Sequence, residues 1–427
     1  SNLTEAEEQN WSHYDLNKDT IPGVSLDLAY KTIVKPKSKT VIVAVIDSGI
    51  DITHEDLRDN IWINKDEIPN NGIDDDNNGY VDDINGWNFL GEANNEQLEY
   101  VRLLASKDTT HPRYREAEEL HRKERVKYIG FKQQYNSILE QVNSSEKAVL
   151  DYLKKDTFSK DDIYKITTED PVLKQHLSII KQSYGFGYDS ITELKEDLER
   201  DLKSFNERLD YNLNIDYDGR SIVNDDPNDL TDKDYGNNNV MPKEGRSHGT
   251  HVTGIIAAKR NNGIGINGAA DNVRIMAIRN TPNGDEYDKD VALAIYYAVD
   301  NGAKVINMSF GKGFSDHSDW VRDAIAYAGK NDVLIVAAAG NDGSNTDEVE
   351  NYPDDQIGTG PEISDTFLKV GATTYNYDSD LVAGFSNYGK SSVDVFAPGE
   401  QIYSCYPKNK YEFAQGTSMA APLVAGI

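Results

Sequence analysis

The sequence predicts an α/β fold built on a doubly wound, mainly parallel sheet, with an all-helical segment inserted into it. The sheet is predicted by short apolar, β-branched runs that alternate with helix-like patterns, because such runs are typical of strands buried on both faces. The insertion is predicted by residues 92–215, which are charged, tyrosine-rich and periodic only at helical spacing. We therefore expect an N-terminal segment 1–40, an α/β domain made of 41–91 and 216–427, and a helical insertion 92–215.

Composition narrows the functional classes. The 427 residues carry a formal net charge of −29, and nucleic acid is an unfavourable partner because phosphate binding needs basic surface. Acidic surface suits calcium and a secreted or cell-envelope protein, although it also serves plain solubility. The single cysteine, Cys405, is expected to be a small buried hydrophobe. No apolar run is long enough to span a bilayer, and a chain that starts at Ser1 without a signal peptide is expected of a processed product.

The first elements lead to a candidate carboxylate. Residues 24–33 are expected to form a short helix, and residues 41–46 are apolar and β-branched, as in a buried parallel strand. That strand ends at Asp47-Ser48-Gly49. Because sites in open α/β sheets lie at the carboxyl ends of strands, Asp47 is a functional candidate, with a helix cap as the alternative.

An acidic loop at 70–83 resembles the opening of an EF-hand calcium loop, since oxygen side chains alternate and a glycine follows at once. The twelfth position is Asn85 instead of a bidentate glutamate, and a strand resumes at 87–89. A solvated acidic turn is the alternative. The calcium ligands expected in this loop are Asp74, Asp76, Asn78 and Asp82.

The insertion shows three apolar stripes at helical spacing, which predict at least three helices packed on one another. Asp170 with Pro171 predicts a helix start, and Ser190 with Glu193 predicts a capping box. Core packing explains these stripes better than a cofactor site does. The stripes are Tyr128, Phe131, Tyr135, Ile138 and Val142; Leu173, Leu177, Ile180 and Tyr184; and Ile191, Leu194, Leu198, Leu202, Phe205 and Leu209.

The α/β pattern returns after a polar loop at 216–247. Alternating strands and helices predict a parallel sheet covered on both faces. The expected helices are 247–259, 290–300 and 320–328, and the expected strands are 273–278, 305–311, 333–339 and 367–372.

A candidate nucleophile lies near the end of the chain. Ser418 stands between small residues, and Pro422 falls in the first turn of an expected helix. A serine needs a base to take its proton, and histidine suits that work. Of the eight histidines, only His248 and His251 lie in a glycine-flanked segment that opens a helix. Read as metal ligands, this pair lacks the glutamate and the i, i+4 spacing of a zinc protease helix.

Four motifs together resemble the signatures of the subtilisin-like serine proteases, in the order Asp, His, Ser typical of that family. The resemblance covers about residues 20–90 and 235–427 but not the helical insertion. The motifs are Asp47-Ser48-Gly49, His248-Gly249-Thr250-His251, Ala339-Gly340-Asn341 and Gly416-Thr417-Ser418-Met419-Ala420-Ala421-Pro422.

The resemblance implies a role for each matching residue. Asp47 would orient His248, His248 would act as general base, and Ser418 would attack the substrate. Asn341 and the Ser418 N–H would bind the oxyanion. The resemblance makes His251 a structural residue. It places the substrate at Ser309, Phe310, Gly311 and Gly340, and a tight calcium site at Asp56 and Asn262.

The function implied is that of a serine endopeptidase that forms an acyl-enzyme, needs structural Ca²⁺ but no organic cofactor, and acts on proteins or peptides. A propeptide or an inhibitor would be a further partner. The family also implies that the domain continues beyond Ile427. A narrow processing peptidase, gated by the insertion, and an inactive binding scaffold are the alternatives. Asp342 leaves two specificities open: basic or polar P1 residues, or an ordinary apolar pocket.

Overall fold

The computed structural model describes residues 3–34 and 39–427. The chain divides into two compact units, the first formed by Ser1–Glu99 with Asp218–Ile427 and the second by Tyr100–Tyr217. Residues 92–99 therefore lie with the first unit, where the Glu96 amide donates to the Asn283 carbonyl at 2.9 Å. The predicted helix at 24–33 is present, while residues 1–2 and 35–38 of the N-terminal segment lie outside the described residues.

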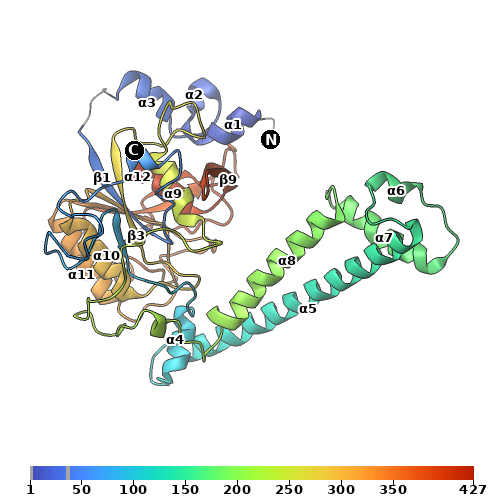
Figure 1. Cartoon of the computed structure of the whole chain (residues 1–427). Coiled ribbons are helices and arrows are strands. Elements are labelled where there is room, and N and C mark those ends of the chain that lie inside the picture. Colours follow the sequence, from blue (N-terminus) through green and yellow to red (C-terminus); the bar gives the residue numbers. More distant parts are fainter. Residues whose placement is uncertain (1–2, 35–38) are drawn as a thin grey trace. The chain divides into compact units, whose positions relative to one another are not determined.

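A seven-stranded parallel sheet forms the centre of the first unit (Figure 1). Its strands are β1 (Val41–Asp47), β2 (Gly86–Asn88), β3 (Val273–Arg279), β4 (Val305–Met308), β5 (Leu334–Ala338), β6 (Phe367–Thr373) and β7 (Val395–Pro398). Their order is β2-β3-β1-β4-β5-β6-β7, and Asp47 at the end of β1 pairs with Arg279 of β3. The predicted α/β sheet is thus confirmed, and β1 and β4 meet near its middle.

Helices cover both faces of this sheet because side chains along a strand alternate in direction. Val43 and Val45 of β1 pack in one apolar cluster with α9 and α12, whereas Ala44 and Ile46 pack in a second cluster with α10 and α11. The helices of this unit are α1 (Glu5–Asn10), α2 (Leu16–Asp19), α3 (Leu26–Thr32), α9 (His248–Ala257), α10 (Asp288–Asp300), α11 (Ser318–Lys330) and α12 (Thr417–Gly426), with shorter turns at Trp11–His13, Arg58–Asn60 and Arg220–Ile222.

Two features of the first unit lack a strong periodic signal. An antiparallel hairpin joins β8 (Ile402–Tyr406) to β9 (Lys410–Ala414), and β7 is only four residues long.

The N-terminal helices pack against the rest of the first unit through Trp11, which is 1% exposed and whose indole N–H lies 3.2 Å from the Glu400 and Gln401 carbonyls.

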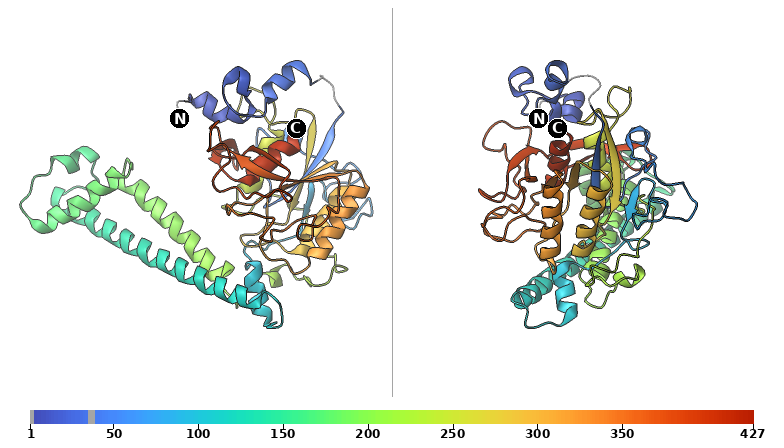
Figure 2. Two further views of the ribbon diagram at one scale, coloured as in Figure 1. Left: turned by 180° about the vertical axis from the view of Figure 1, so that it is seen from behind. Right: turned by 90° about the vertical axis from the view of Figure 1, so that its left-hand side faces the viewer.

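The second unit is helical, and its long helices α5 and α8 run alongside each other (Figure 2). Its helices are α5 (Tyr114–Leu153), α6 (Lys160–Lys165), α7 (Pro171–Gly185), α8 (Ile191–Glu207) and the π-helical turn Arg208–Asn212, while α4 (Glu99–Ser106) begins at the boundary. Most members of the predicted stripes meet in one apolar cluster, whereas Tyr128, Phe131 and Phe205 form an aromatic contact outside it. Asp170 caps α7 as predicted, but the capping box at Ser190 is only half formed, because the Glu193 carboxylate accepts the Asp189 N–H. Among the described residues, no helix combines the length and apolarity needed to cross a membrane.

Candidate active site

Asp47 and His248 form the first pair of the site. The Asp47 carboxylate is 1% exposed at the end of β1, and its Oδ1 lies 2.7 Å from His248 Nδ1 at the start of α9. Gly249 permits this approach, since a Cβ there would stand 2.2 Å from the Gly49 carbonyl oxygen. The Ser48 hydroxyl also accepts the Gly249 N–H at 3.1 Å. These contacts hold the end of β1 against the start of α9.

The electrostatics of this pair suit an imidazole that exchanges protons. Burial lowers the pKa of His248, and the charge and hydrogen bond of Asp47 raise it more, so the net pKa lies above its usual value. The side chain of His248 remains 40% exposed, which leaves its other nitrogen reachable from solvent. A carboxylate on Nδ1 sets the tautomer whose Nε2 can accept a proton.

Ser418 lies in the first turn of α12, beside the end of β4. Its hydroxyl donates to the Ser309 carbonyl at 3.0 Å, and the Ser309 hydroxyl donates to the Ser418 carbonyl at 2.9 Å. Attack on a substrate needs the Ser418 hydroxyl to turn to His248, and such bonds commonly form only when substrate binds. The helix N-terminus favours negative charge next to this hydroxyl.

Asn341 presents an amide beside Ser418. Its Oδ1 accepts the Thr417 N–H at 2.8 Å and the Thr417 hydroxyl at 3.0 Å, which leaves Nδ2 as the donor for a ligand. Gly340, with φ of 100°, adopts a backbone conformation that other residues rarely take, and a Cβ there would lie 2.3 Å from Asn387 Nδ2. The loop therefore carries an amide donor in a fixed orientation.

Asn387 is a site residue that the sequence analysis missed. It is 1% exposed, its Nδ2 donates to the Ala339 carbonyl, and its Oδ1 accepts the N–H groups of Asp342 and Ser344, all within 2.9–3.0 Å. It thus holds the loop that carries Asn341. A lone asparagine in a loop, distant in sequence from every motif, gives no signal that could have revealed this.

A cleft of about 450 Å³ lies next to Ser418. Three of the four predicted substrate-binding residues line it, namely Phe310, Gly311 and Gly340. Ser309 is 2% exposed and lies behind Ser418, so its side chain supports the wall instead of facing the cleft. Asp342 also lines the cleft, as the sequence analysis considered.

Two further residues match their expected structural roles. His251 is 3% exposed, and its Nε2 lies 3.1 Å from the Ile402 carbonyl and 3.0 Å from the Glu412 carbonyl. Burial lowers its pKa to about 4, so the ring is neutral at pH 7. Cys405 is fully buried in the apolar cluster beneath α9 and α12, and burial raises the pKa of its thiol. Neither residue is available for proton transfer or attack.

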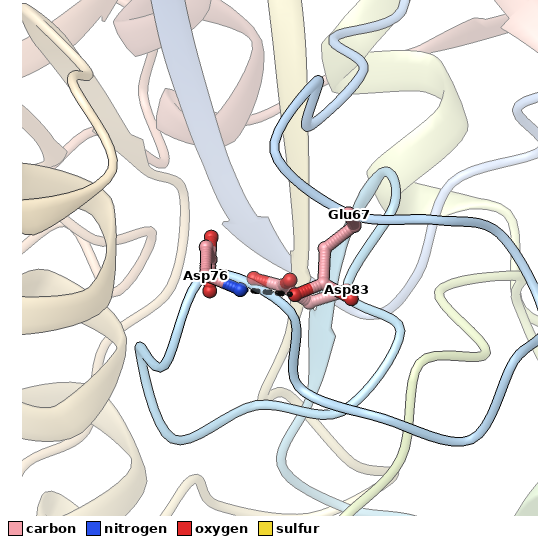
Figure 3. A group of neighbouring side chains, drawn as sticks. All are labelled: Glu67, Asp76 and Asp83. Carbon is pink, nitrogen blue, oxygen red and sulfur yellow. Dashed lines mark hydrogen bonds between the residues drawn. The ribbon is translucent and has the colours of Figure 1, made fainter.

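Three carboxylates could hold a metal ion: Glu67, Asp76 and Asp83, with oxygens within 4.8 Å of one another (Figure 3). Burial raises the pKa of both Glu67 and Asp83. Glu67 Oε2 is buried and has no hydrogen-bond partner among the residues at 3–34 and 39–427, an arrangement that a cation would stabilise. The residues therefore fit a hard divalent ion such as Ca²⁺.

This set differs from the four calcium ligands expected from the sequence, of which only Asp76 belongs to it. The Asp74 carboxylate accepts the N–H groups of Asn78 and Gly79. The Asp82 carboxylate accepts those of Asn71 and Gly72. Asn78 lies beside the group, where its Nδ2 donates to Asp76 and Asp83. Asp74 and Asp82 therefore brace the loop.

The second expected metal pair, Asp56 and Asn262, is brought together. Asn262 Nδ2 donates to Asp56 Oδ1 at 2.6 Å, and the Ile266 N–H donates to Asp56 Oδ2 at 3.2 Å. Burial raises the pKa of Asp56. A cation here would need the Asn262 amide turned, so that its oxygen faces the carboxylate.

Comparison with known proteins places these features in a family. A family model described as the subtilase family matches residues 38–427. The thermophilic serine proteinase of Bacillus sp. (strain AK1) is 42% identical over 195 residues, which cover 45% of this chain and 44% of that protein. Thermitase of Thermoactinomyces vulgaris is 40% identical over 195 residues, covering 45% of this chain and 64% of thermitase. The chain thus spans less than two thirds of the length of each of these two relatives.

Among solved structures, a cold adapted subtilisin-like serine proteinase is 32% identical with a TM-score of 0.36, covering 44% of this chain and 62% of that one.

Proposed function

The chain belongs to the subtilase family, and on that premise we propose that it is a serine endopeptidase with Asp47, His248 and Ser418 as its catalytic triad. The observation that carries this proposal is the 2.7 Å contact of Asp47 Oδ1 with His248 Nδ1. It fixes the imidazole so that Nε2 is the free basic nitrogen, which a general base requires.

The chemistry follows from these groups. His248 Nε2 takes the Ser418 proton as Oγ attacks the scissile carbonyl, and the buried Asp47 carboxylate stabilises the imidazolium that forms. The imidazolium then gives its proton to the leaving amine. Water, activated by the same imidazole, releases the acyl group from Ser418 Oγ.

The tetrahedral oxyanion is held by Asn341 Nδ2 and the Ser418 N–H. Because Thr417 already occupies Asn341 Oδ1, the amide need not reorganise when negative charge develops. The substrate backbone lies along the segment from Ser309 to Gly311, next to the cleft, and recognition by backbone pairing fixes direction more than sequence.

A Ca²⁺ ion at Glu67, Asp76 and Asp83 stabilises the first unit and takes no part in peptide hydrolysis. Asp83 also accepts the Tyr297 hydroxyl from α10 at 2.5 Å, so a cation here would tie the acidic loop to the helices of the sheet. The acidic chain and this site fit a secreted or cell-envelope protein, where calcium is plentiful.

A fluorophosphonate probe tests the proposal. It should label the wild-type chain and leave Ser418→Ala unlabelled, while the matched variant Ser344→Ala, at another serine of the same cleft, stays labelled. Labelling that persists in Ser418→Ala would refute the assignment of the nucleophile. An unlabelled wild type that also cleaves no peptide would favour the scaffold alternative.

A further inference from the structure

The cleft next to Ser418 is lined by carboxylates from two separate loops of the first unit. Asp285 and Glu286 precede α10, Asp342 follows β5, and Glu350 comes from the loop after it. The two loops are more than 50 residues apart in the sequence, so only the fold brings them to one space of about 450 Å³. A concave surface lined by one sign of charge concentrates its field and attracts the opposite charge.

Lys312 is the single basic residue on this wall within the described part of the chain, and its charge is already matched. Its Nζ lies 2.8 Å from Glu99 Oε2 and 2.9 Å from Asp288 Oδ1, and it donates to the Glu286 carbonyl at 2.7 Å. Its side chain is 2% exposed. Since two carboxylates surround one ammonium group, Lys312 does not cancel the acidity of the cleft.

Asp342 and Glu350 are the exposed carboxylates of the wall. The Asp342 N–H donates to Asn387 Oδ1 at 3.0 Å, which fixes the backbone directly after Asn341. Glu350 comes two residues before Tyr352, whose backbone exchanges hydrogen bonds of 2.8 and 2.9 Å with Lys312. The segments that carry Asp342 and Glu350 are therefore both anchored.

The position of the proposed oxyanion site indicates which substrate side chain would lie near Asp342 and Glu350. The scissile carbonyl belongs to the P1 residue, and its oxygen must lie next to Asn341 Nδ2 and the Ser418 N–H. Asp342 follows Asn341 directly, and Gly311, which also lines the cleft, has no side chain to obstruct the space. The P1 side chain thus enters the cleft that Asp342 and Glu350 both line.

We infer that this chain prefers substrates with lysine or arginine at P1, whose cationic group binds between Asp342 and Glu350. This inference rests on the proposed function, because the side chain is presented only when a peptide lies against Ser418. Because both carboxylates are solvent-accessible, each is expected to raise the preference for a basic P1 residue only modestly, by roughly fivefold in kcat/KM.

The test uses four peptide p-nitroanilides that differ only in the P1 residue: lysine, arginine, leucine or phenylalanine. For the wild type, kcat/KM should be higher with lysine and arginine, and this preference should shrink as salt screens the charges. Asp342→Asn and Glu350→Gln should each lower the ratio of kcat/KM for the basic substrates to kcat/KM for the leucine substrate by roughly fivefold. Glu348→Gln is the matched control, since Glu348 is exposed in the same loop but does not line the cleft.

A wild type that prefers leucine and phenylalanine, with a ratio indifferent to the double variant and to salt, would overturn the inference while leaving the proposed function intact. An equal effect of Glu348→Gln and Glu350→Gln would overturn it as well, because a general charge effect would then suffice. If the variants fold poorly, the wild type alone decides: a peptide argininal should inhibit it more tightly than the matching leucinal. A chain that is neither labelled by a fluorophosphonate nor able to cleave any peptide would reject the proposed function and the inference together.

Discussion

The side-chain oxygen of Asn341 accepts two hydrogen bonds from Thr417, one from its N–H at 2.8 Å and one from its hydroxyl at 3.0 Å. The same hydroxyl accepts the Gly340 N–H at 3.0 Å. Thr417 therefore orients the amide of the neighbouring loop, with Nδ2 as the donor proposed to bind the oxyanion. Thr417 immediately precedes Ser418, and it therefore links the proposed nucleophile to the amide proposed to stabilise the tetrahedral oxyanion.

Thr417→Val should lower kcat by roughly tenfold with little change in KM, because it removes a fully buried hydroxyl that orients Asn341 and acts mainly in the transition state. Asn341→Ala should cost more, roughly 10²–10³ in kcat. Steady-state kinetics on a small peptide measures both. Thr417→Ser keeps the hydroxyl and is the control. A rise in KM at constant kcat would mean that these residues bind the ground state.

Ser418→Ala should retain the wild-type fold and lose turnover by several orders of magnitude, since the members of a triad act as a unit. Circular dichroism and peptide hydrolysis measure the two properties. Double replacement of Ser418 and His248 by alanine should cost little more than Ser418→Ala alone. Additive losses would contradict a shared mechanism.

Activity should fall as acid protonates His248, and the midpoint should lie above the ordinary imidazole value of about 6.5. The direction of this shift follows from Asp47, because a neighbouring carboxylate raises the pKa of the imidazole. The protonated ring cannot accept a proton, so activity is lost below that pKa. Asp47→Asn should move the acid limb of kcat/KM to lower pH and reduce kcat by roughly 10⁴. An acid limb that stays in place would assign it to another group.

Removal of Tyr100–Tyr217 should preserve cleavage of small peptides and alter discrimination among folded proteins. Within the described residues, the cleft is lined by first-unit residues alone, and the apolar cluster of the insertion lies within the second unit. A short Gly/Ser bridge from Glu99 to Asp218 should suffice, because Gly219 lies against the Asn95 carbonyl. Complete loss of peptide cleavage in a deletion that still melts cooperatively would give the insertion a part in the active site.

Calcium should raise the melting temperature. A cation bound only by the folded state adds about 2.7 kcal/mol at a hundredfold excess over its Kd. Glu67→Gln with Asp83→Asn should abolish this shift and leave peptide hydrolysis intact. Asp82→Asn should lower the melting temperature while keeping the calcium shift, because Asp82 binds backbone amides outside the carboxylate group. Identical wild-type melting curves with calcium and with chelator would exclude a structural ion.

The sequence by itself determined the α/β class, the helical insertion and the candidate triad. Helices and strands were predictable from the periodicity of apolar residues. A buried parallel strand such as β1 must be apolar on both faces, and an amphipathic helix such as α8 must have an apolar residue every three to four positions. The triad was readable because Asp47, His248 and Ser418 each lie in a short motif at an element end. The short β7 and the β8–β9 hairpin have weak patterns and were not predicted.

Only the tertiary structure decided which distant side chains share a space. Asn387 holds the loop of Asn341 across 48 positions of sequence, from its side chain to the Ala339 carbonyl. Glu67 lies next to Asp76 and Asp83, whereas the carboxylates of Asp74 and Asp82 accept hydrogen bonds from amides of their own loop. The order of acidic residues along the chain shows where carboxylates are available. The direction in which each carboxylate points depends on the N–H donors that the folded backbone brings near it.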